Sequence, residues 1–323
     1  MTEIIAFRNV EKRYGEKIVI DQLNLSIQTG EIFVLVGPSG SGKTTTLKMI
    51  NALTEPTEGD VYFKGKRIKD YNLQKMRWQM GYVLQQIALF PTMTVKQNIE
   101  VIPEMLGWEK EKRKMDVDRL LKLVNLNPEQ YRNRMPRELS GGEQQRIGIL
   151  RAIAANPEVI LMDEPFSALD PISRSSLQEL VLQLHEDLGT TIVFVTHNMK
   201  EAIKLGDRIA VMRNGRLIQC DTPEKIIAEP KTKFIETFFE ETGEDEAALV
   251  TVRQMMQAGF YQTTVMKKEQ PIITEDTTLQ EVYRVLATAS SVSIKRGQEV
   301  VGQLSGQDVF AFLSRKEEAD EES

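Results

Sequence analysis

The chain has 323 residues, of which 41% are hydrophobic and 27% charged, with a formal net charge of −6. This composition is ordinary for a globular protein with a packed core, and the length allows one to three domains. The acidic balance argues against a general nucleic-acid binder, which would usually be basic, so we expect no nucleic acid among the partners. The single cysteine, Cys220, excludes an internal disulfide and suits a reducing cytosol.

The sequence shows no membrane-targeting feature. The N-terminal stretch "MTEIIAFRNV" lacks the layout of a signal peptide. No apolar run approaches the ~20 residues that a membrane-spanning helix needs. We therefore expect any membrane role to come through a partner protein.

Residues 3 to about 70 read as β-strands separated by turns, with a single helix among them. The helix follows "GPSGSGKT" (37–44), which itself follows the apolar, strand-length run "EIFVLV" (31–36). Leu47, Ile50 and Leu53 then recur at helical spacing. A strand, a glycine-rich loop and a helix start together turn backbone N–H groups and the positive end of the helix dipole toward a phosphate.

This stretch meets the phosphate-loop pattern G-x-x-x-x-G-K-[S/T]. Lys43 adds a point charge for the phosphates, and the Thr44 hydroxyl is a ligand for Mg²⁺. The alternative is a flexible Gly/Ser loop, which the flanking strand and helix disfavour. The residues predicted to bind nucleotide here are Gly37, Pro38, Ser39, Gly40, Ser41, Gly42, Lys43, Thr44 and Thr45.

A mainly helical region extends from about 90 to 155 and contains a second glycine-bearing motif. "LSGGEQQR" (139–146) places Ser140, Gly141 and Gly142 before a helix-like run. Such a start is again suited to an anion, because the glycine N–H groups, the serine hydroxyl and the helix dipole converge. The alternative is an ordinary capped helix, since serine is a good N-cap. Two phosphate cradles about a hundred residues apart suggest two chains that share nucleotides head to tail.

From residue 157 strands and helices alternate, which predicts a parallel α/β sheet. "VILMDEP" (159–165) has the pattern of a buried strand that ends in Asp163 and Glu164. Ligands of α/β folds lie at the carboxyl ends of strands. Asp163 is therefore placed to hold Mg²⁺ in its second shell, and Glu164 to polarise a water in line with the terminal phosphate. The alternative, two solvated acids in a capped turn, is disfavoured behind a phosphate loop.

The sequence has two histidines. His185, in "LVLQLHEDLG", is expected to be a partly exposed helix residue without a catalytic role. His197 follows the apolar strand "TIVFVT" and so lies at the carboxyl edge of a strand. There it is placed to hydrogen-bond the γ-phosphate and to hold a water.

Near residue 240 the pattern changes. At 236–246, "ETFFEETGEDE", acidity rises and periodicity fades, and we interpret this stretch as a linker. Residues 249–314 predict a small separate domain. The last seven residues, "EEADEES", form an acidic tail that is expected to be disordered. Within that domain the sequence predicts a hairpin around Arg296–Gly297 and a closing helix in "GQDVFAFL" (306–313). A further helix is predicted whose shared face carries Leu279, Val282, Tyr283 and Leu286.

Seven features follow one another in a fixed order: Tyr14, "GPSGSGKT", Gln85, "LSGGE", "VILMDE", "SALD" and His197. In this order they make residues 1 to about 240 resemble the ATP-binding subunit of an ABC transporter. "LKMINALTEPTEGDV", "LSGGEQQRIGILRAIAANPEVILMDEPFSALDPISR" and "VTHNMKEA" resemble more closely the branch that imports glycine betaine, carnitine, choline and similar quaternary amines. The C-terminal segment resembles a cystathionine-β-synthase-type (CBS) module.

The resemblance implies an α/β fold with a defined order of parts. A P-loop ABC ATPase domain would contain a mixed core sheet, an antiparallel β subdomain and an α-helical subdomain, followed by a small α+β CBS-like domain. The implied boundaries are 1–240 for the ATP-binding domain (helical subdomain about 90–155), 241–248 for a linker, 249–314 for a CBS-like regulatory or dimerisation domain, and 315–323 for the acidic tail.

The resemblance also implies that ATP and Mg²⁺ are bound, and it assigns residues to them. Tyr14 would stack on adenine, although the residue by itself favours a core aromatic. Lys43 would contact the β- and γ-phosphate oxygens. Mg²⁺ would be held by Thr44, Gln85 and Asp163; the resemblance favours Gln85 over Gln86, and the alternative for Gln85 is a surface glutamine.

The remaining roles concern hydrolysis and the second subunit. Glu164 would be the general base, and His197 matches the family's switch position. Ser140, Gly141 and Gly142 would grip the γ-phosphate bound to the other subunit. Asp170 would couple the two sites, its alternative being a helix cap before Pro171.

Three positions or segments depart from the family pattern. Glu143 stands where glutamine is commonest, and Asn198 where aspartate is usual. One CBS repeat, about 271–313, is found where relatives often carry two, preceded by the helix-like "VRQMMQAGF". We therefore expect the module to pair with the other subunit's copy rather than to sense an adenine nucleotide.

The function implied is an ATPase that powers uptake of a quaternary-amine compound through separate permease subunits. It would act as a homodimer at the cytoplasmic face of the cell membrane, with a solute-binding protein or domain as an indirect partner. Alternative roles are import of another betaine-like solute, such as ergothioneine, or bile-related exclusion.

Other classes of ATPase share these motifs but fit the sequence less well. DNA-associated ATPases insert long coiled coils between the phosphate loop and the second glycine motif, whereas 45–138 holds no sustained heptads. Translation-factor types carry two ATPase halves, and this chain has one phosphate loop. Fused exporters would need membrane helices, which the sequence does not show.

Overall fold

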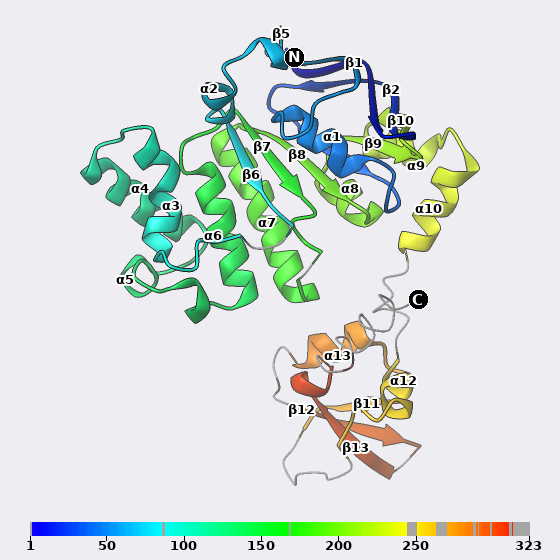
Figure 1. Cartoon of the computed structure of the whole chain (residues 1–323). Helices are drawn as coiled ribbons and strands as arrows, with labels where there is room; N and C mark the ends of the chain where they lie inside the picture. The colour runs from blue at the N-terminus through cyan, green and yellow to red at the C-terminus, as the bar shows by residue number, and fades with distance from the viewer. Residues whose placement is uncertain are drawn as a thin grey trace. The chain divides into compact units, whose positions relative to one another are not determined.

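The computed structural model describes residues 2–85, 88–167, 169–243, 251–262, 270–286, 289, 291–297, 299–309 and 312. The chain divides into two compact units, Met1–Phe239 and Glu240–Ser323 (Figure 1). Each has its own hydrophobic core, so each is described by itself. Within the described helices, none is long and apolar enough to cross a membrane.

A six-stranded sheet forms the centre of the first unit, in the order β10-β9-β3-β8-β7-β6. Its strands are β3 (Ile32–Val36), β6 (Met80–Val83), β7 (Val159–Asp163), β8 (Thr191–Thr196), β9 (Arg208–Arg213) and β10 (Arg216–Asp221). β3, β7 and β8 are buried at every residue, as expected for parallel strands covered on both faces. Five strands run parallel, and β10 pairs antiparallel with β9.

The five parallel strands agree with the predicted parallel α/β sheet, and the antiparallel β10 confirms the mixed sheet implied by the resemblance. Arg213 of β9 pairs with Arg216 of β10, so two residues, Asn214 and Gly215, make the turn. Both have positive φ, 49° and 77°. Asn-Gly is the preferred dipeptide for such a tight hairpin, because both residues tolerate this backbone conformation. The "NG" pair was therefore a local signal for antiparallel pairing.

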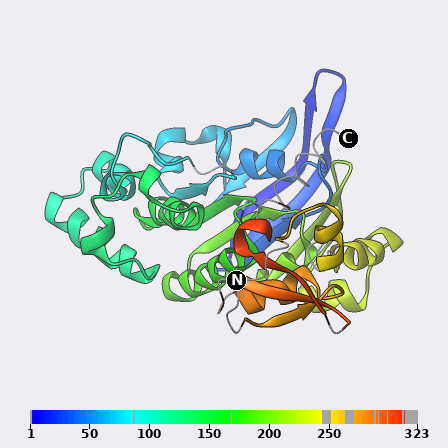
Figure 2. The ribbon, with the colours of Figure 1, turned by 90° about the horizontal axis from the view of Figure 1, so that it is seen from below.

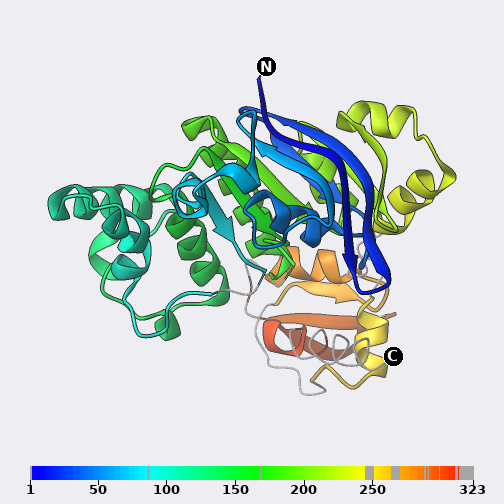
Figure 3. The ribbon, with the colours of Figure 1, turned by 45° about the horizontal axis from the view of Figure 1, so that its top comes forward.

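A second, four-stranded sheet has the order β2-β1-β4-β5 and is antiparallel throughout (Figure 3). Its strands are β1 (Glu3–Tyr14), β2 (Lys17–Gln28), β4 (Glu58–Phe63) and β5 (Lys66–Arg67). Short elements follow it, namely the 3-10 turn η1 (Ile68–Asp70) and helix α2 (Leu73–Arg77). The predicted antiparallel β subdomain is thereby confirmed.

The central strand β3 contributes to two hydrophobic cores. Successive side chains of a strand point to opposite faces, and β3 sends Phe33 and Leu35 to one face. There they pack with the antiparallel sheet and with α1 (Lys43–Ile50). Ile32, Val34 and Val36 point to the other face and join the core beneath the helices α6, α7 and α8.

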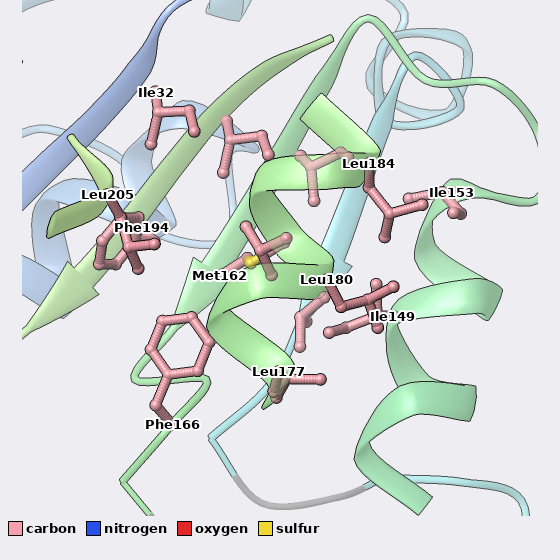
Figure 4. Close-up of a cluster of buried hydrophobic side chains, with 14 of the residues drawn as sticks. Ile32, Ile149, Ile153, Met162, Phe166, Leu177, Leu180, Leu184, Phe194 and Leu205 are labelled. Atoms are coloured by element: carbon pink, nitrogen blue, oxygen red, sulfur yellow. The ribbon is translucent and has the colours of Figure 1, made fainter. Parts of the chain in front are cut away.

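Figure 4 shows this second core, in which Phe166 meets the ring of Phe194 edge-on at 6.0 Å between centroids. The helices that cover it are α6 (Gly141–Ile153), α7 (Pro171–Leu188) and α8 (Met199–Leu205).

The helical subdomain extends from one end of the six-stranded sheet (Figure 2). It contains α3 (Val95–Met105), α4 (Lys110–Leu123), α5 (Pro128–Tyr131), the 3-10 turn η2 (Pro136–Glu138) and α6. α3 begins with a reciprocal capping box, in which Thr94 and Gln97 each accept a hydrogen bond from the other's backbone N–H. This part confirms the predicted α-helical subdomain.

The stretch interpreted as a linker at 236–246 is helical up to residue 243, so that prediction was wrong there. α9 (Pro223–Ala228) precedes α10 (Lys233–Gly243). Ile235 and Phe238 of α10 are buried in the core, and Phe234 stacks on Phe238 at 5.4 Å. Spacing i, i+1, i+4 gives these apolar residues one face although Glu236 lies between them in the sequence. Residues 244–248 of the predicted linker lie outside the described residues.

The second unit contains a three-stranded sheet, β11-β12-β13, with β11 parallel and β13 antiparallel to β12. Its elements are α12 (Val252–Gln257), β11 (Ile272–Thr274), α13 (Leu279–Leu286), β12 (Ser291–Arg296) and β13 (Glu299–Ser305). Arg296 pairs with Glu299, so the hairpin lies where it was predicted. Residues 306–309 are helical, and Leu279 and Val282 are buried as predicted. The Tyr283 side chain and the acidic tail 315–323 lie outside the described residues.

Candidate active site

The carboxyl ends of four neighbouring strands bring the predicted residues together. In the register of the sheet Val36 of β3 pairs with Thr196 of β8, and Val195 of β8 pairs with Asp163 of β7. Met162 of β7 pairs in turn with Val83 of β6. The phosphate loop, His197, Asp163–Glu164 and Gln85 each follow directly on one of these ends, so the topology places them at one edge of the sheet.

Two glycines of the loop 37–44 have no room for a side chain. A Cβ at Gly37 would lie 2.1 Å from the carbonyl oxygen of Met212, and one at Gly42 would lie 2.4 Å from Ile20 Cδ1. Gly42, with φ 101°, is also the N-cap of α1. The loop is therefore packed against β9 and β2 by its backbone, which leaves its N–H groups for an anion at the start of α1.

Lys43 is buried, and its ammonium is hydrogen-bonded to the phosphate loop itself. Its ammonium donates to the carbonyl oxygens of Gly37 at 2.7 Å and Pro38 at 3.0 Å. Burial lowers the pKa of Lys43, and the carboxylates of Glu164 and Asp163 oppose that shift. Ser41 Oγ is buried without a hydrogen-bond partner among the described residues. A buried cation and an unpartnered hydroxyl in one loop fit a phosphate oxygen.

The outer part of the loop is more open. Ser39 and Gly40 are exposed, Pro38 and Thr45 are half-buried, and Ser41 N donates to the carbonyl of Pro38 at 3.2 Å. These residues surround the loop entrance rather than its base.

Thr44 and Asp163 meet across the strand edge. Thr44 Oγ1 donates to Asp163 Oδ1 at 2.8 Å, and Asp163 is 6% exposed. A hydroxyl and a carboxylate are hard oxygen donors, which suit Mg²⁺. Two protein oxygens fit Mg²⁺, which usually keeps waters and substrate phosphates as its other ligands.

Glu164 has an unusual backbone and two polar neighbours. Its φ is 44°, in the left-handed region that non-glycine residues rarely adopt, and its N–H donates to the carbonyl of Val195 at 3.2 Å. Such strain often marks functional positions. Glu164 Oε2 lies 3.3 Å from His197 Nδ1 and 3.5 Å from Gln85 Nε2. Gln85 and His197 are themselves exposed, so the carboxylate stands between two side chains that face solvent.

Each member of the Glu164–His197 pair shifts the pKa of the other. The hydrogen bond from His197 is the main cause that lowers the pKa of Glu164, although burial opposes it. The same hydrogen bond raises the pKa of His197, with smaller support from Glu201 and opposition from burial and Lys43. A lowered carboxyl pKa keeps Glu164 ionised, the form in which a general base accepts a proton.

Tyr14 lies at the end of β1 with 54% of its surface exposed, so the alternative of a core aromatic is wrong. Lys12 Nζ stands 4.8 Å above its ring. Tyr14 pairs with Lys17 of β2, the strand whose Ile20 packs against Gly42 of the phosphate loop, so its exposed ring is available for stacking. Gln86, the alternative to Gln85, lies outside the described residues.

The second glycine motif forms an exposed helix start. Ser140 caps α6 by accepting from Glu143 N at 3.3 Å, and Glu143 Oε2 accepts from Ser140 N at 2.7 Å. The alternative of a capped helix is thus present in the chain, and the departure at Glu143 takes part in the cap. Gly141 remains exposed, and Gly142 is half-buried. Among the described residues, no hydrogen bond joins this motif to the phosphate loop of the same chain.

Asp170 and His185 lie at opposite ends of α7. Asp170 Oδ1 accepts from Ser173 N at 3.0 Å, so the predicted alternative of a helix cap is also realised. His185 is half-buried, with Nδ1 2.9 Å from the Thr190 carbonyl.

The sequence analysis missed two buried residues beside His197. Thr196 Oγ1 donates to Glu201 Oε2 at 2.6 Å, and Glu201 is 7% exposed. Neither residue belongs to a motif, and an isolated glutamate on a helix gives no signal that it is buried.

Comparison with known proteins gives consistent matches. The model of the ABC transporter family matches residues 20–167. The choline transport ATP-binding protein OpuBA of Bacillus subtilis is 46% identical over 88% of this chain and 72% of its own. The carnitine transport ATP-binding protein OpuCA of Listeria monocytogenes is 48% identical over 84% and 69%. The osmoprotectant import ATP-binding protein OsmV of Salmonella typhimurium is 41% identical over 88% and 73%.

Solved structures agree with the fold. The dimeric structure of the bacterial ABC transporter cassette MJ0796 is 37% identical, with a TM-score of 0.62, over 68% of this chain and 99% of that one. A dimeric post-hydrolysis state of the same cassette, bound to ADP and Pi, is 36% identical with a TM-score of 0.61 over the same shares.

Proposed function

This chain belongs to the ATP-binding subunits of the ABC transporter family, and from that premise we propose that it hydrolyses ATP to drive uptake of a quaternary-amine compound through a partner membrane permease. The supporting observation is the convergence of Lys43, Thr44, Asp163, Glu164 and His197 at one strand edge. Similar proteins that are named for choline, carnitine and osmoprotectant transport support the choice of solute class.

The residues divide the work of hydrolysis among them. Loop N–H groups and Lys43 bind the phosphates, while Tyr14 stacks on the adenine. Glu164 accepts a proton from a water molecule, and the oxygen of that water bonds to the γ-phosphorus. At the same time the bond breaks between the γ-phosphorus and the oxygen that bridges the β- and γ-phosphates. His197 and Gln85 hold that water and the γ-phosphate in line. The products are ADP and phosphate, and the proton resides on Glu164 until it is released.

Mg²⁺ supplies charge neutralisation of the phosphates when it is bound. Thr44 and Asp163 would hold it at the loop, with Gln85 reaching it from β6. The 2.8 Å contact between the first two keeps their oxygens together before any ligand arrives.

The exposed motif Ser140–Gly142 supports a head-to-tail homodimer. The backbone N–H groups of this motif begin helix α6, which has 13 residues. Among the described residues, none of these groups is hydrogen-bonded to the phosphate loop of the same chain. In the proposed dimer they bind the γ-phosphate held by the other subunit, and Asp170 couples the two sites. The dimeric cassette structures among the similar proteins support this arrangement.

The proposed setting is the cytoplasmic face of the cell membrane, against permease subunits, with a solute-binding protein or domain as indirect partner. Residues 1–240 form the ATP-binding domain, and 249–314 form a CBS-like regulatory or dimerisation domain. Of the linker expected at 241–248, the first three residues belong to the end of α10. The parallel β11, the crossover helix α13 and the β12–β13 hairpin support the last assignment.

Purification of the chain and measurement of Mg²⁺-dependent phosphate release from ATP test the enzymatic part. Absence of release, or release unaffected by Lys43→Ala, contradicts the assignment. Reconstitution with the permease into ATP-loaded vesicles tests the transport part. We expect uptake of labelled glycine betaine, carnitine or choline, and uptake of none of them contradicts the proposed solute class.

A further inference from the structure

Three hydrogen bonds form a closed ring around the backbone of His197. Thr196 Oγ1 donates to Glu201 Oε2 at 2.6 Å. Asn198 N donates to Thr196 Oγ1 at 3.0 Å. Glu201 N donates to Asn198 Oδ1 at 3.3 Å, which closes the ring through the first turn of α8. The residues on both sides of His197 are therefore fixed, while the imidazole of His197 lies outside this hydrogen-bonded ring and faces solvent.

The ring is buried although it contains a carboxylate. Thr196 is 2% and Glu201 7% exposed. A buried carboxylate is destabilising unless it is well hydrogen-bonded, and burial raises the pKa of Glu201 while Thr196 and Arg174 oppose the shift. An amide or an apolar side chain at position 201 would not carry the free-energy cost of desolvating a carboxylate. Packing alone therefore does not explain why this position is a glutamate.

The second oxygen of Glu201 faces α7. Glu201 Oε1 lies 3.5 Å from Gln178 Nε2 and 4.0 Å from Arg174 Nε. Arg174 also donates through Nη2 to the Leu169 carbonyl at 3.1 Å, in the loop that connects Glu164 to α7. One carboxylate thus links the segment that carries His197 to the helix that follows Glu164.

We propose that Glu201 is a positioning residue for the hydrolysis reaction, which it serves by holding Thr196, and with it the His197 ring, against the Glu164 carboxylate. This inference rests on the proposed function. His197 reaches Glu164 at 3.3 Å from an exposed position, where few contacts of its own side chain restrict it. The hydrogen-bonded ring of Thr196, Asn198 and Glu201, together with its link to α7, restricts the backbone that carries His197. Misplacement of a reacting group by about 1 Å costs on the order of 10²-fold in rate.

The substitutions follow from hydrogen-bonding capacity. A carboxylate has two acceptor oxygens, one for Thr196 and one for the α7 side chains, whereas the amide in Glu201→Gln has one. Thr196→Val removes the hydroxyl at nearly constant volume, and Thr196→Ser keeps it. Glu31→Gln is the matched control, because Glu31 is also a buried carboxylate, 5% exposed and paired with Arg208 at 3.0 Å. Glu31 precedes β3 and so lies at the opposite end of that strand from the phosphate loop.

Steady-state ATPase kinetics of the full chain form the first test. Glu201→Gln and Thr196→Val are each expected to lower kcat by about 10–100-fold, while KM for ATP stays within about threefold. The double variant should be no slower than the slower single one, since both remove the same link. Thr196→Ser and Glu31→Gln should keep kcat within about threefold. Equal loss of kcat in Glu31→Gln, or normal kcat in folded Thr196→Val, overturns the proposal.

The second test does not depend on catalysis. The chain has two histidines, so a histidine-labelled sample gives one set of imidazole signals for each of them in NMR. The set from His185 is the internal reference. We expect the His197 signal to shift or broaden in Thr196→Val and to stay in place in Thr196→Ser, while His185 is unchanged in both. An unchanged His197 signal in Thr196→Val overturns the link. If the wild-type chain releases no phosphate while His197 still shifts, the proposed function fails and the positional link stands.

Discussion

Thr44 Oγ1 and Asp163 Oδ1 lie 2.8 Å apart although 119 residues separate them in the chain. One belongs to the first turn of α1 and the other ends β7, two strands away in the sheet from β3. Their contact shows that the strand order β3-β8-β7, rather than sequence proximity, assembles the site.

This pair predicts a magnesium effect. Asp163→Asn removes the carboxylate charge and keeps the side-chain size, so affinity for ATP in the presence of Mg²⁺ should fall by about 10-fold or more, since metal-site substitutions typically cost this much. Affinity in EDTA, where the ion is absent, should change little. Fluorescent-nucleotide titration measures both. Thr29→Val is the control, because the Thr29 hydroxyl donates to the Thr2 carbonyl before β3, at the opposite end of that strand from the phosphate loop. An equal loss with and without Mg²⁺ contradicts the metal role.

Glu164→Gln should retain ATP binding and lose about 10²–10⁴-fold in turnover, because an amide cannot accept the proton of the attacking water. Unhydrolysed ATP should then hold two chains together, since each Ser140–Gly142 motif binds the other's γ-phosphate in the proposed dimer. Size-exclusion chromatography with Mg-ATP tests this, with the exposed Glu186→Gln as control. A monomeric Glu164→Gln chain with ATP bound counts against the shared site.

Lys43→Met should have opposite effects with and without ligand. Burial lowers the pKa of this ammonium, which shows that its charge is costly in the ligand-free chain. Removing it should leave the melting temperature without nucleotide unchanged or higher. The stabilisation by Mg-ATP, about 2.7 kcal/mol at a hundredfold excess over Kd, should be lost. Differential scanning fluorimetry measures both, and a large fall in the ligand-free melting temperature contradicts this account of Lys43.

The Glu164–His197 pair predicts a pH dependence of stability without nucleotide or metal. The pKa of His197 is raised in the folded chain, so its contribution is complete below about pH 6.5 and is lost as pH rises through the raised value. The pKa of Glu164 is lowered, so its contribution is present above about pH 4.5 and is lost as pH falls through the lowered value.

The melting-temperature difference between wild type and His197→Ala should therefore be largest between about pH 4.5 and 6.5. Because His197 is more than half exposed, the difference should be small, about 1–3 °C. Near pH 9 it should vanish. His185→Ala, which removes a ring bonded to a backbone carbonyl, is the control. A difference that does not depend on pH contradicts the ion pair.

The helix α10, which runs into the stretch that the sequence suggested was a linker, predicts a stability effect. Its residue Ile235 is fully buried, so Ile235→Ala should destabilise the first unit by about 2–5 kcal/mol. Ile227, 54% exposed on the preceding helix, is the control and should change stability little. Calorimetry with Mg-ATP identifies the transition of the unit that binds nucleotide. A destabilisation of Ile235→Ala no larger than that of Ile227→Ala would mean that α10 adds nothing to this core.

The sequence predicted the site well where one short stretch carries both a strand and its terminal residue. Asp163, Glu164 and His197 each directly follow an apolar run, so their position at the carboxyl edge needed only the rule for parallel strands. The helical and antiparallel parts were predictable for the same reason, because their periodicity is local.

What the sequence could not predict depends on contacts between distant segments. The burial of Glu201 and the docking of α10 each depend on contacts with segments farther along the chain. Glu236 and Glu240, on either side of Phe238 in the sequence, concealed the apolar face of this helix. The roles of the site residues remain predictions for the experiments above.

The alternation of β3 between two hydrophobic cores has a consequence for dynamics. An amide proton on this strand exchanges with solvent only when the layers on both of its faces have separated, because each layer by itself keeps the strand covered. The strand that ends at Val36 and leads into the phosphate loop should therefore be among the last parts of the unit to open. Fluctuations that unfold the outer helices would leave the loop's anchor in place, and the nucleotide would lose it only when the whole unit unfolds.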